Sequence, residues 1–114
     1  MIFDAPVEAV RIASEKALRS LGWEIDTDRS TPGEGVFVTE SRGLNFQDFG
    51  VYGEGLRHRL HVLVKPDSGG NTSVLVRREL YHEKRILWNK EQTAVQPQDT
   101  SIESSLLDAI RRLL

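Results

Sequence analysis

Apolar side chains recur at helical spacing in two segments, one near each end of the chain. In each segment they fall on one face at about 100° per residue. The pattern predicts a first helix over residues 6–21, with Pro6 in its first turn and Gly22 just beyond its end. It predicts a second helix from Thr100 to the end of the chain, opened by a capping box between Thr100 and Glu103. The two apolar stripes are Val7, Val10, Ala13, Ala17, Leu18 and Leu21, and Ile102, Leu106, Ala109, Ile110 and Leu113.

Between the helices, apolar and polar side chains alternate as they do in strands with one buried face. The alternation is clearest over residues 56–65 and 72–81, and the turn residues 66–71 join these two runs into a predicted hairpin. Strict alternation over residues 23–28, followed by turn residues 29–35 and a second strand over residues 36–40, predicts another hairpin with a longer loop. Short connections favour antiparallel pairing, because parallel neighbours need long crossovers.

Three stretches lack clear alternation. Residues 41–55 are predicted to form an irregular, Gly-rich loop and residues 89–98 a polar connection, while residues 82–88 either prolong the preceding strand or begin a fifth one. A sheet that is apolar on one face needs a cover, and the two helices are the only elements available. We therefore predict a single α+β domain over residues 1–114. It is a two-layer sandwich whose antiparallel sheet of four to five strands carries the N- and C-terminal helices on one face.

The amino-acid composition excludes or disfavours several classes of protein. The 114 residues are 39% hydrophobic and 28% charged, which suits one compact core. A net charge of −2 disfavours a nucleic-acid binder. The absence of cysteine excludes disulfides, thiolate nucleophiles and Cys-ligated zinc. We expect no transmembrane segment in this chain, because no run of 18 apolar residues exists. The start carries no secretory signal, so the protein is cytoplasmic unless a targeting segment precedes Met1.

Few residue patterns point to chemistry. His58 and His61 lie three apart on a predicted strand, so they face opposite sides and cannot chelate one metal ion. His82 lies beyond the next strand. The stretch Asp67–Gly70 resembles the nucleophile segment of trypsin-like proteases, but its residue types are those of a turn between strands. We predict no catalytic residue, no metal site and no cofactor.

Three carboxylates, those of Glu24, Asp26 and Asp28, alternate onto one side of a predicted strand. Such a row could hold a hard cation or work as an acid–base pair. We expect instead that the carboxylates form cross-strand ion pairs on the solvated face of the sheet. The expected basic partners are Arg57, Arg59, Lys65 and Arg77.

The best candidate for a binding surface is the Gly-rich loop with the basic strand face that follows it. Loops of about fifteen residues are uncommon in compact domains unless they have a function. Aromatic and Arg side chains are also frequent energetic centres of interfaces. The competing interpretation is that the aromatic residues close the edge of the core. The predicted binding residues are Phe46, Phe49, Tyr52, Arg57, Arg59 and Arg77.

One family resemblance spans nearly the whole chain. The segments DAPVEAVRIASEKALRSLGWEIDTDRSTPGEGVFVTE, RHRLHVLVKPDSGGNTSVLVRREL and SIESSLLDAIRRLL resemble, in their order, domains of bacterial envelope lipoproteins of the BamC type. These are accessory proteins of the outer-membrane β-barrel assembly machinery. The resemblance implies a helix-grip fold, a periplasmic or membrane-anchored location, a lipid anchor upstream of Met1, and a non-catalytic role in binding a protein partner.

Two hypotheses about function follow. The first is a non-enzymatic interaction domain of the cell envelope that uses the sheet face or the aromatic loop. The second is a small-ligand-binding domain, or an enzyme, with a cavity between the sheet and a helix. The inward positions are mostly Val, Leu and Ile, which favours a packed core and therefore the first hypothesis.

Overall fold

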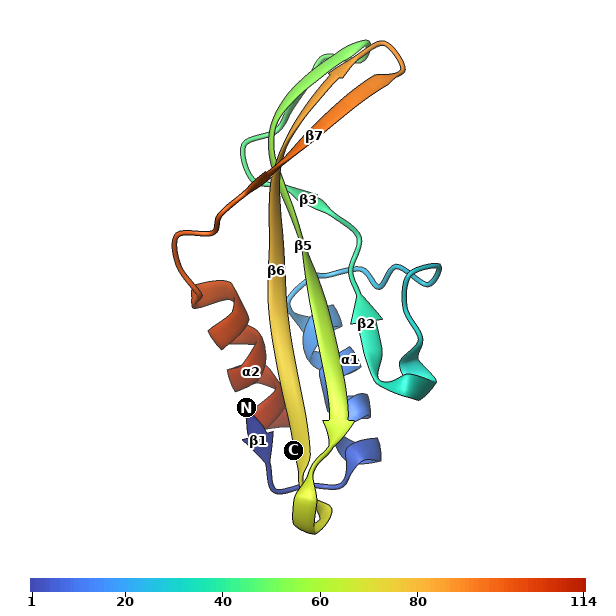
Figure 1. Ribbon diagram of the computed structural model, residues 1–114, viewed down its shortest axis with the longest axis vertical. Helices are drawn as coiled ribbons and strands as arrows, with labels where there is room; N and C mark the ends of the chain where they lie inside the picture. The colour runs from blue at the N-terminus through green and yellow to red at the C-terminus, as the bar shows by residue number, and fades with distance from the viewer.

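The computed structural model describes residues 1–114, and its central feature is one long hairpin. Strand β5 (Tyr52–Pro66) and strand β6 (Thr72–Ile86) each have 15 residues and pair without interruption from Pro66↔Thr72 to Tyr52↔Ile86. The turn between them holds the short 3₁₀ helix η2 (Ser68–Gly70), where a turn was predicted. Residues 82–86 therefore prolong the preceding strand (Figure 1).

The other strands add to the two sides of this hairpin, and all pairs are antiparallel. On the β5 side lie β2 (Val36–Val38), β3 (Arg42–Gly43) and β4 (Gln47–Asp48). On the β6 side lie β1 (Ile2–Phe3), near the η2 turn, and β7 (Asn89–Val95), at the opposite end. The sheet has seven strands, three of only two residues each, where four to five were predicted.

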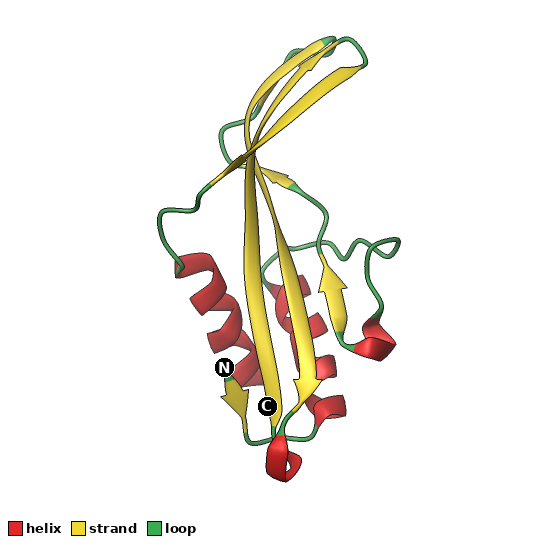
Figure 2. Ribbon diagram, viewed as in Figure 1, coloured by secondary structure: helices red, strands yellow, loops and turns green.

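Both helices cover the same face of the sheet. Helix α1 (Val7–Ser20) and helix α2 (Ser101–Leu113) contact each other and pack against β5 and β6 (Figure 2). A single cluster of buried residues joins the three parts, which confirms the predicted α+β class with antiparallel strands. The helices contribute Val10, Ala13, Ala17, Leu18, Leu106, Ala109 and Ile110, and the hairpin contributes Leu60, Val62, Val64 and Val74.

The hairpin is longer than the helices that cover it. Its far end, together with β4 and β7, projects beyond both helices and gives the molecule extents of 52 × 28 × 22 Å (Figure 1). We call this part, residues 44–57 and 81–95, the distal arm. The predicted irregular loop 41–55 forms part of it and contains β3, β4 and the start of β5, so that prediction is wrong in part.

Two positions of β5 in the arm, 53 and 55, are glycine because another part of the chain passes very close to them. Residues 45 and 46 cross directly over Gly53 and Gly55. At Gly55, which has φ +148°, an added Cβ would lie 2.4 Å from Asn45 O and 2.6 Å from Phe46 Cα. At Gly53 it would lie 2.7 Å from the Phe46 ring. Only glycine leaves room for this crossing.

Two predicted elements are wrong. Residues 89–95 are a strand and not a connection; six of the seven are exposed, so no buried face produces an alternating pattern. Residues 23–28 are not a strand and make only one bridge, between Ile25 and Thr39. The reason is local, because the Asp26 carboxylate accepts hydrogen bonds from the backbone N–H groups of Asp28 and Arg29 and bends the chain into a turn.

The helix ends differ in how well they were predicted. Beyond α1, Gly22 has φ +84° and its N–H bonds to Arg19 O, while Trp23 N–H bonds to Leu18 O, which is a Schellman motif. The capping box of α2 is wrong, since no side chain of Thr100 or Glu103 caps the helix. Instead the Asp99 carboxylate accepts hydrogen bonds from the backbone N–H and the hydroxyl of Ser101.

Candidate functional site

The face of the sheet that carries no helix has a polar hollow. Side chains of β5 and β6 alternate, so Arg57, Arg59, Glu79, Tyr81 and Glu83 point away from the helices. Together with residues of β7 and of the segment before β3, they surround a space of about 530 Å³, which we call the polar hollow. Its lining is Asp26, Arg29, Glu40, Ser41, Arg57, Arg59, Glu79, Tyr81, Glu83, Arg85, Lys90 and Gln92.

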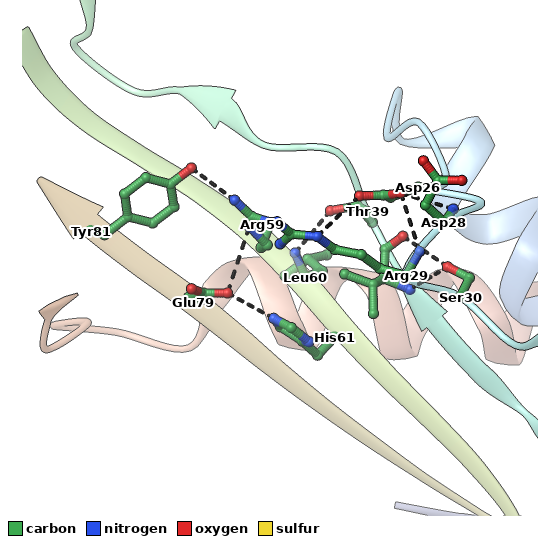
Figure 3. Close-up of polar contacts among 11 residues, drawn as sticks. Asp26, Asp28, Arg29, Ser30, Thr39, Arg59, Leu60, His61, Glu79 and Tyr81 are labelled. Carbon is green, nitrogen blue, oxygen red and sulfur yellow. Dashed lines mark hydrogen bonds and ion pairs between the residues drawn. The ribbon is translucent and has the colours of Figure 1, made fainter. Parts of the chain in front are cut away.

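Arg59 lies at the centre of the polar contacts in this hollow. It is 9% exposed, and its Nη2 donates to the Tyr81 hydroxyl at 3.1 Å (Figure 3). Its Nε lies 3.6 Å from Glu79 Oε2 and has no hydrogen-bond partner. The same Glu79 oxygen lies 2.8 Å from His61 Nε2. Glu79 is thus shared between Arg59 and His61, and the buried Nε–H of Arg59 has no acceptor.

Arg57 is held beside Arg59 by neutral groups. Its Nε donates to Ser41 Oγ at 2.9 Å, and its Nη2 donates to Ser41 O at 3.3 Å. Its guanidinium lies over the Phe46 ring, 5.0 Å from the centroid. Arg57 takes part in none of the ion pairs of the structure, so its charge is not balanced by a neighbouring carboxylate.

Tyr81 stands directly across the β5–β6 ladder from Arg57 and is 4% exposed. Burial acts to raise the pKa of its hydroxyl, but hydrogen bonds with Ser41 and Arg59 and the charge of Arg59 outweigh burial. The pKa of Tyr81 therefore lies below its ordinary value. The Tyr81 hydroxyl is thus polarised by the guanidinium groups of Arg59 and Arg57.

The carboxylates of the hollow have partners of their own. Glu83 is 3% exposed; Gln92 Nε2 donates to it at 2.9 Å and Lys90 Nζ lies 3.7 Å away. Asp26 pairs with Arg29 at 3.5 Å, within its own turn. The expected ion pairs of Glu24, Asp26 and Asp28 with basic residues of β5 and β6 are therefore wrong. The loss of the 23–28 strand removes the register that would have created them.

The three histidines lie apart, and no group of three metal-ligating side chains converges. His58 faces the helices and is 4% exposed. Its ring meets that of Trp23 edge-on at 4.9 Å, and Arg78 Nη1 lies 3.1 Å from its Nδ1. Burial, and then the charges of Arg78 and Arg42, lower the pKa of His58 to about 4. His61 faces the opposite side, as predicted.

The end of the distal arm is apolar. Leu87 and Trp88 form the two-residue turn between β6 and β7, and Leu87 has φ +56°, which is strained for a side chain of this size. Its N–H bonds to Val51 O in the neighbouring loop. We call the exposed hydrophobic residues here the apolar tip. They are Phe49 (65% exposed), Val51 (65%), Ile86 (50%), Leu87 (52%) and Trp88 (85%).

The predicted binding residues divide between these two places. Arg57 and Arg59 line the polar hollow, and the half-buried Phe46 packs beneath Arg57. Phe49 belongs to the apolar tip, and its ring stacks on that of Tyr52 with the ring centroids 6.2 Å apart. The Tyr52 hydroxyl donates to Glu54. Arg77 is exposed on the same face as Arg59 but does not line the hollow.

The sequence analysis did not select two residues of the apolar tip, Leu87 and Trp88, or two residues of the polar hollow, Ser41 and Tyr81. Leu87 and Trp88 were not selected, although an apolar pair between two polar stretches is an unusual composition for a hairpin turn. Ser41 and Tyr81 were missed because their contacts with Arg57 and Arg59 depend on the register of β5 against β6.

Comparison with known proteins does not assign the chain to a family. No family model matches the chain, and no curated protein matches its sequence. Neither helix combines the length and the apolar character needed to cross a membrane.

Proposed function

We propose that this chain is a non-catalytic interaction domain of the bacterial cell envelope that binds a protein partner through the apolar tip. The exposure of Trp88 carries the proposal. A tryptophan that is 85% exposed at the end of a projecting hairpin adds nothing to the core. Tryptophan is also among the residues most enriched at the energetic centres of interfaces. The resemblance to BamC-type envelope lipoproteins supports the cellular setting.

The charges around the apolar tip favour a protein over a lipid surface. The arm carries Arg57, Lys84, Arg85 and Lys90 but also Asp48, Glu54, Glu83 and Glu91, so acidic and basic groups balance. An apolar centre within a rim of both signs is typical of protein interfaces. Anionic lipid surfaces instead attract clusters of basic residues. The narrow, convex tip fits a concave apolar pocket on the partner.

Strain in the turn supports the same proposal. A bulky residue with positive φ costs on the order of 1–3 kcal/mol, and such strain clusters at sites of function. Glycine or asparagine is usual in a two-residue hairpin turn. Here Leu87 has φ +56° and stands next to Trp88, so the turn exposes two large side chains at the expense of stability.

The alternative of a ligand cavity between sheet and helices has less in its favour. That space holds the 14 buried side chains of the hydrophobic cluster. A hollow of about 460 Å³ does open at the edge of this layer, between β6, residues 94–100 and Glu103 of α2, but its lining is mostly polar and it lies outside the buried cluster.

Site-specific photo-crosslinking in cells of the native host tests the proposal. A benzophenone amino acid is placed at position 88 and, as the matched control, at position 12. Ile12 is also exposed, at 55%, but lies on α1. We expect one discrete protein adduct from position 88 and none from position 12. Equal adducts from both positions, no adduct, or adducts with lipid alone would contradict a protein contact at the apolar tip.

The identified partner then allows a quantitative test. We expect Trp88→Ala to weaken its binding at least 30-fold, which corresponds to about 2 kcal/mol, the threshold of an interface hot spot. Ile12→Ala should leave the affinity unchanged. Unfolding of the Trp88→Ala variant should stay within about 0.5 kcal/mol of the parent protein, which separates lost contact from lost folding. Fractionation of the native host tests the envelope location, and a purely cytoplasmic pool would contradict it.

A further inference from the structure

We infer that the polar hollow binds a carboxylate group, with Arg57, Arg59 and Tyr81 as its hydrogen-bond donors. This site lies on the helix-free face, away from the apolar tip, and does not depend on the function proposed for the tip. The three side chains belong to adjacent positions of β5 and β6, where Arg57 faces Tyr81 and Arg59 faces Glu79 across the ladder.

The first observation is a buried donor without an acceptor. Arg59 is more than nine-tenths buried, yet its Nε has no hydrogen-bond partner. Buried polar atoms are nearly always paired, because an unpaired one loses its hydration without compensation. The nearest carboxylate oxygen, Glu79 Oε2, is 3.6 Å away and is already bonded to His61. Since Nε has almost no exposed surface, a ligand carboxylate would bond to the outer N–H groups of the Arg59 guanidinium, which lines the hollow.

The second observation is the unbalanced charge of Arg57. This guanidinium is positioned by the Ser41 hydroxyl, the Ser41 carbonyl and the Phe46 ring, which are all neutral. Two of its donors are thereby fixed in direction, and the cation is left for a partner from outside. The Tyr81 hydroxyl, already polarised by Arg59, adds a third donor next to it.

The charge balance of the hollow selects the ligand class. Five basic side chains and four carboxylates line it. Arg29, Arg59, Arg85 and Lys90 each pair with a carboxylate, Arg85 with Asp48 outside the hollow, so Arg57 alone is left to pair with one added negative charge. The basic residues are Arg29, Arg57, Arg59, Arg85 and Lys90, and the acidic residues are Asp26, Glu40, Glu79 and Glu83. A phosphate dianion would exceed this balance and meet Glu79 and Glu83 at close range. A planar monoanionic carboxylate matches both the charge and the fork of a guanidinium.

Carboxylates reach such a site either as free organic acids or as the C-terminus of a peptide. Two probes separate these sources. Acetate represents the free acid, and the tripeptide N-acetyl-Ala-Ala-Ala with a free carboxyl group represents the peptide, with its C-terminal amide as a control. Inorganic phosphate tests the charge argument, and sodium chloride at equal ionic strength serves as the baseline.

The arginine Nε–Hε resonances in ¹⁵N–¹H NMR spectra report binding at the guanidinium groups of the hollow. We expect a saturable shift of the Arg59 Nε signal with acetate or the free-acid tripeptide. Phosphate should give at least a fivefold weaker response, and the amide none. Arg11 Nε is the internal control, because it is also buried and unpartnered but belongs to α1. Its signal should not move.

Variants complete the test. Arg57→Gln should weaken carboxylate binding at least tenfold, while Arg77→Gln, an exposed arginine on the same face, should leave it unchanged. Trp88→Ala should also leave it unchanged, so failure of the tip proposal does not affect this one. Arg57→Gln keeps a donor toward Ser41, and an unchanged unfolding midpoint shows that the variant is folded. A shift that does not saturate, that persists in Arg57→Gln, or that is stronger with phosphate overturns the inference.

Discussion

Protonation of His58 should destabilise the protein in mildly acidic solution. The imidazole is 4% exposed, packs edge-on against Trp23, and faces the guanidinium of Arg78 at 3.1 Å. Since a guanidinium has no acceptor, Arg78 donates to Nδ1 and the histidine is neutral. A proton on Nδ1 would remove this hydrogen bond and place two positive charges side by side. Burial and the charges of Arg78 and Arg42 accordingly lower the pKa of His58 to about 4.

The direction and size of this loss of stability follow from the difference between the pKa of His58 in the folded and in the unfolded chain. Above pH 6.5, the ordinary pKa, His58 is neutral in the folded and the unfolded chain, so it causes no pH dependence. Between pH 6.5 and about 4 only the unfolded chain takes up the proton, so stability falls as the pH falls. The full difference corresponds to at most ~3 kcal/mol. Between pH 7 and 5 we expect a loss of about 1–2 kcal/mol, since only part of the range is crossed and solvent screens the guanidinium charges.

Urea unfolding at pH 7, 6 and 5, followed by tryptophan fluorescence, measures this loss. The chain has two tryptophans, so a Trp88→Phe background leaves Trp23, next to His58, as the reporter. In this background His58→Asn keeps an acceptor near Arg78 but cannot be protonated. It should lower stability at pH 7 and remove most of the change between pH 7 and 5. The control His61→Gln, on the opposite face, should retain the change.

The reasoning fails if His58→Asn shows the same loss of stability between pH 7 and 5 as the parent. It also fails if His61→Gln abolishes the loss, because the titrating group would then be on the helix-free face. Direct NMR titration of the imidazole gives an independent value. A His58 pKa of 6 or above in the folded protein would contradict the burial argument.

Four further substitutions test the distal arm by chemical denaturation. Gly55→Ala should cost more than about 2 kcal/mol, because its Cβ would meet backbone atoms of residues 45 and 46 at 2.4–2.6 Å; a neutral effect would contradict the close crossing. Leu87→Gly should raise stability by up to about 1 kcal/mol by relieving a positive φ, and a loss would show that the Leu87 side chain has a structural role. Phe46→Ala should lower the free energy of unfolding by roughly 1–3 kcal/mol, because Phe46 is a half-buried packing residue. Phe49→Ala should change it by less than about 0.5 kcal/mol, because Phe49 is exposed; equal losses would show that both residues pack in the structure.

The parts of the fold that sequence predicted are those with one buried face. Both helices and the central run of β5 and β6 carry apolar residues at the period of their own geometry. The helix boundaries were predicted to within a residue, whereas β5 begins four residues earlier and β6 ends five residues later than the predicted runs. The distal arm has no helix to cover it, so its strands have no apolar face to mark them in the sequence. Strand β7 is the clearest case, with only Val95 of its seven residues not exposed. Periodicity cannot detect a strand that is exposed on both sides.

The candidate sites were predicted in part for a similar reason. Arg57 and Arg59 were found because alternation along one strand places them on the solvated face. Their partners Ser41 and Tyr81 come from other segments, and only the register of three strands brings them together. Trp88 is defined by a two-residue turn between a strand whose end was uncertain and a strand that was not predicted at all.

The continuity of β5 and β6 also makes the distal arm an adjustable spacer. Both strands run from the core to the arm without a bulge, and β7 follows β6 in unbroken register. Inserting one residue into each of the three strands would lengthen the arm by about 3.3 Å but would turn the tip toward the opposite face. Inserting two residues would restore the original direction. The reach of Trp88 from the core can therefore change in steps of about 7 Å while the buried cluster between the helices and the hairpin stays the same.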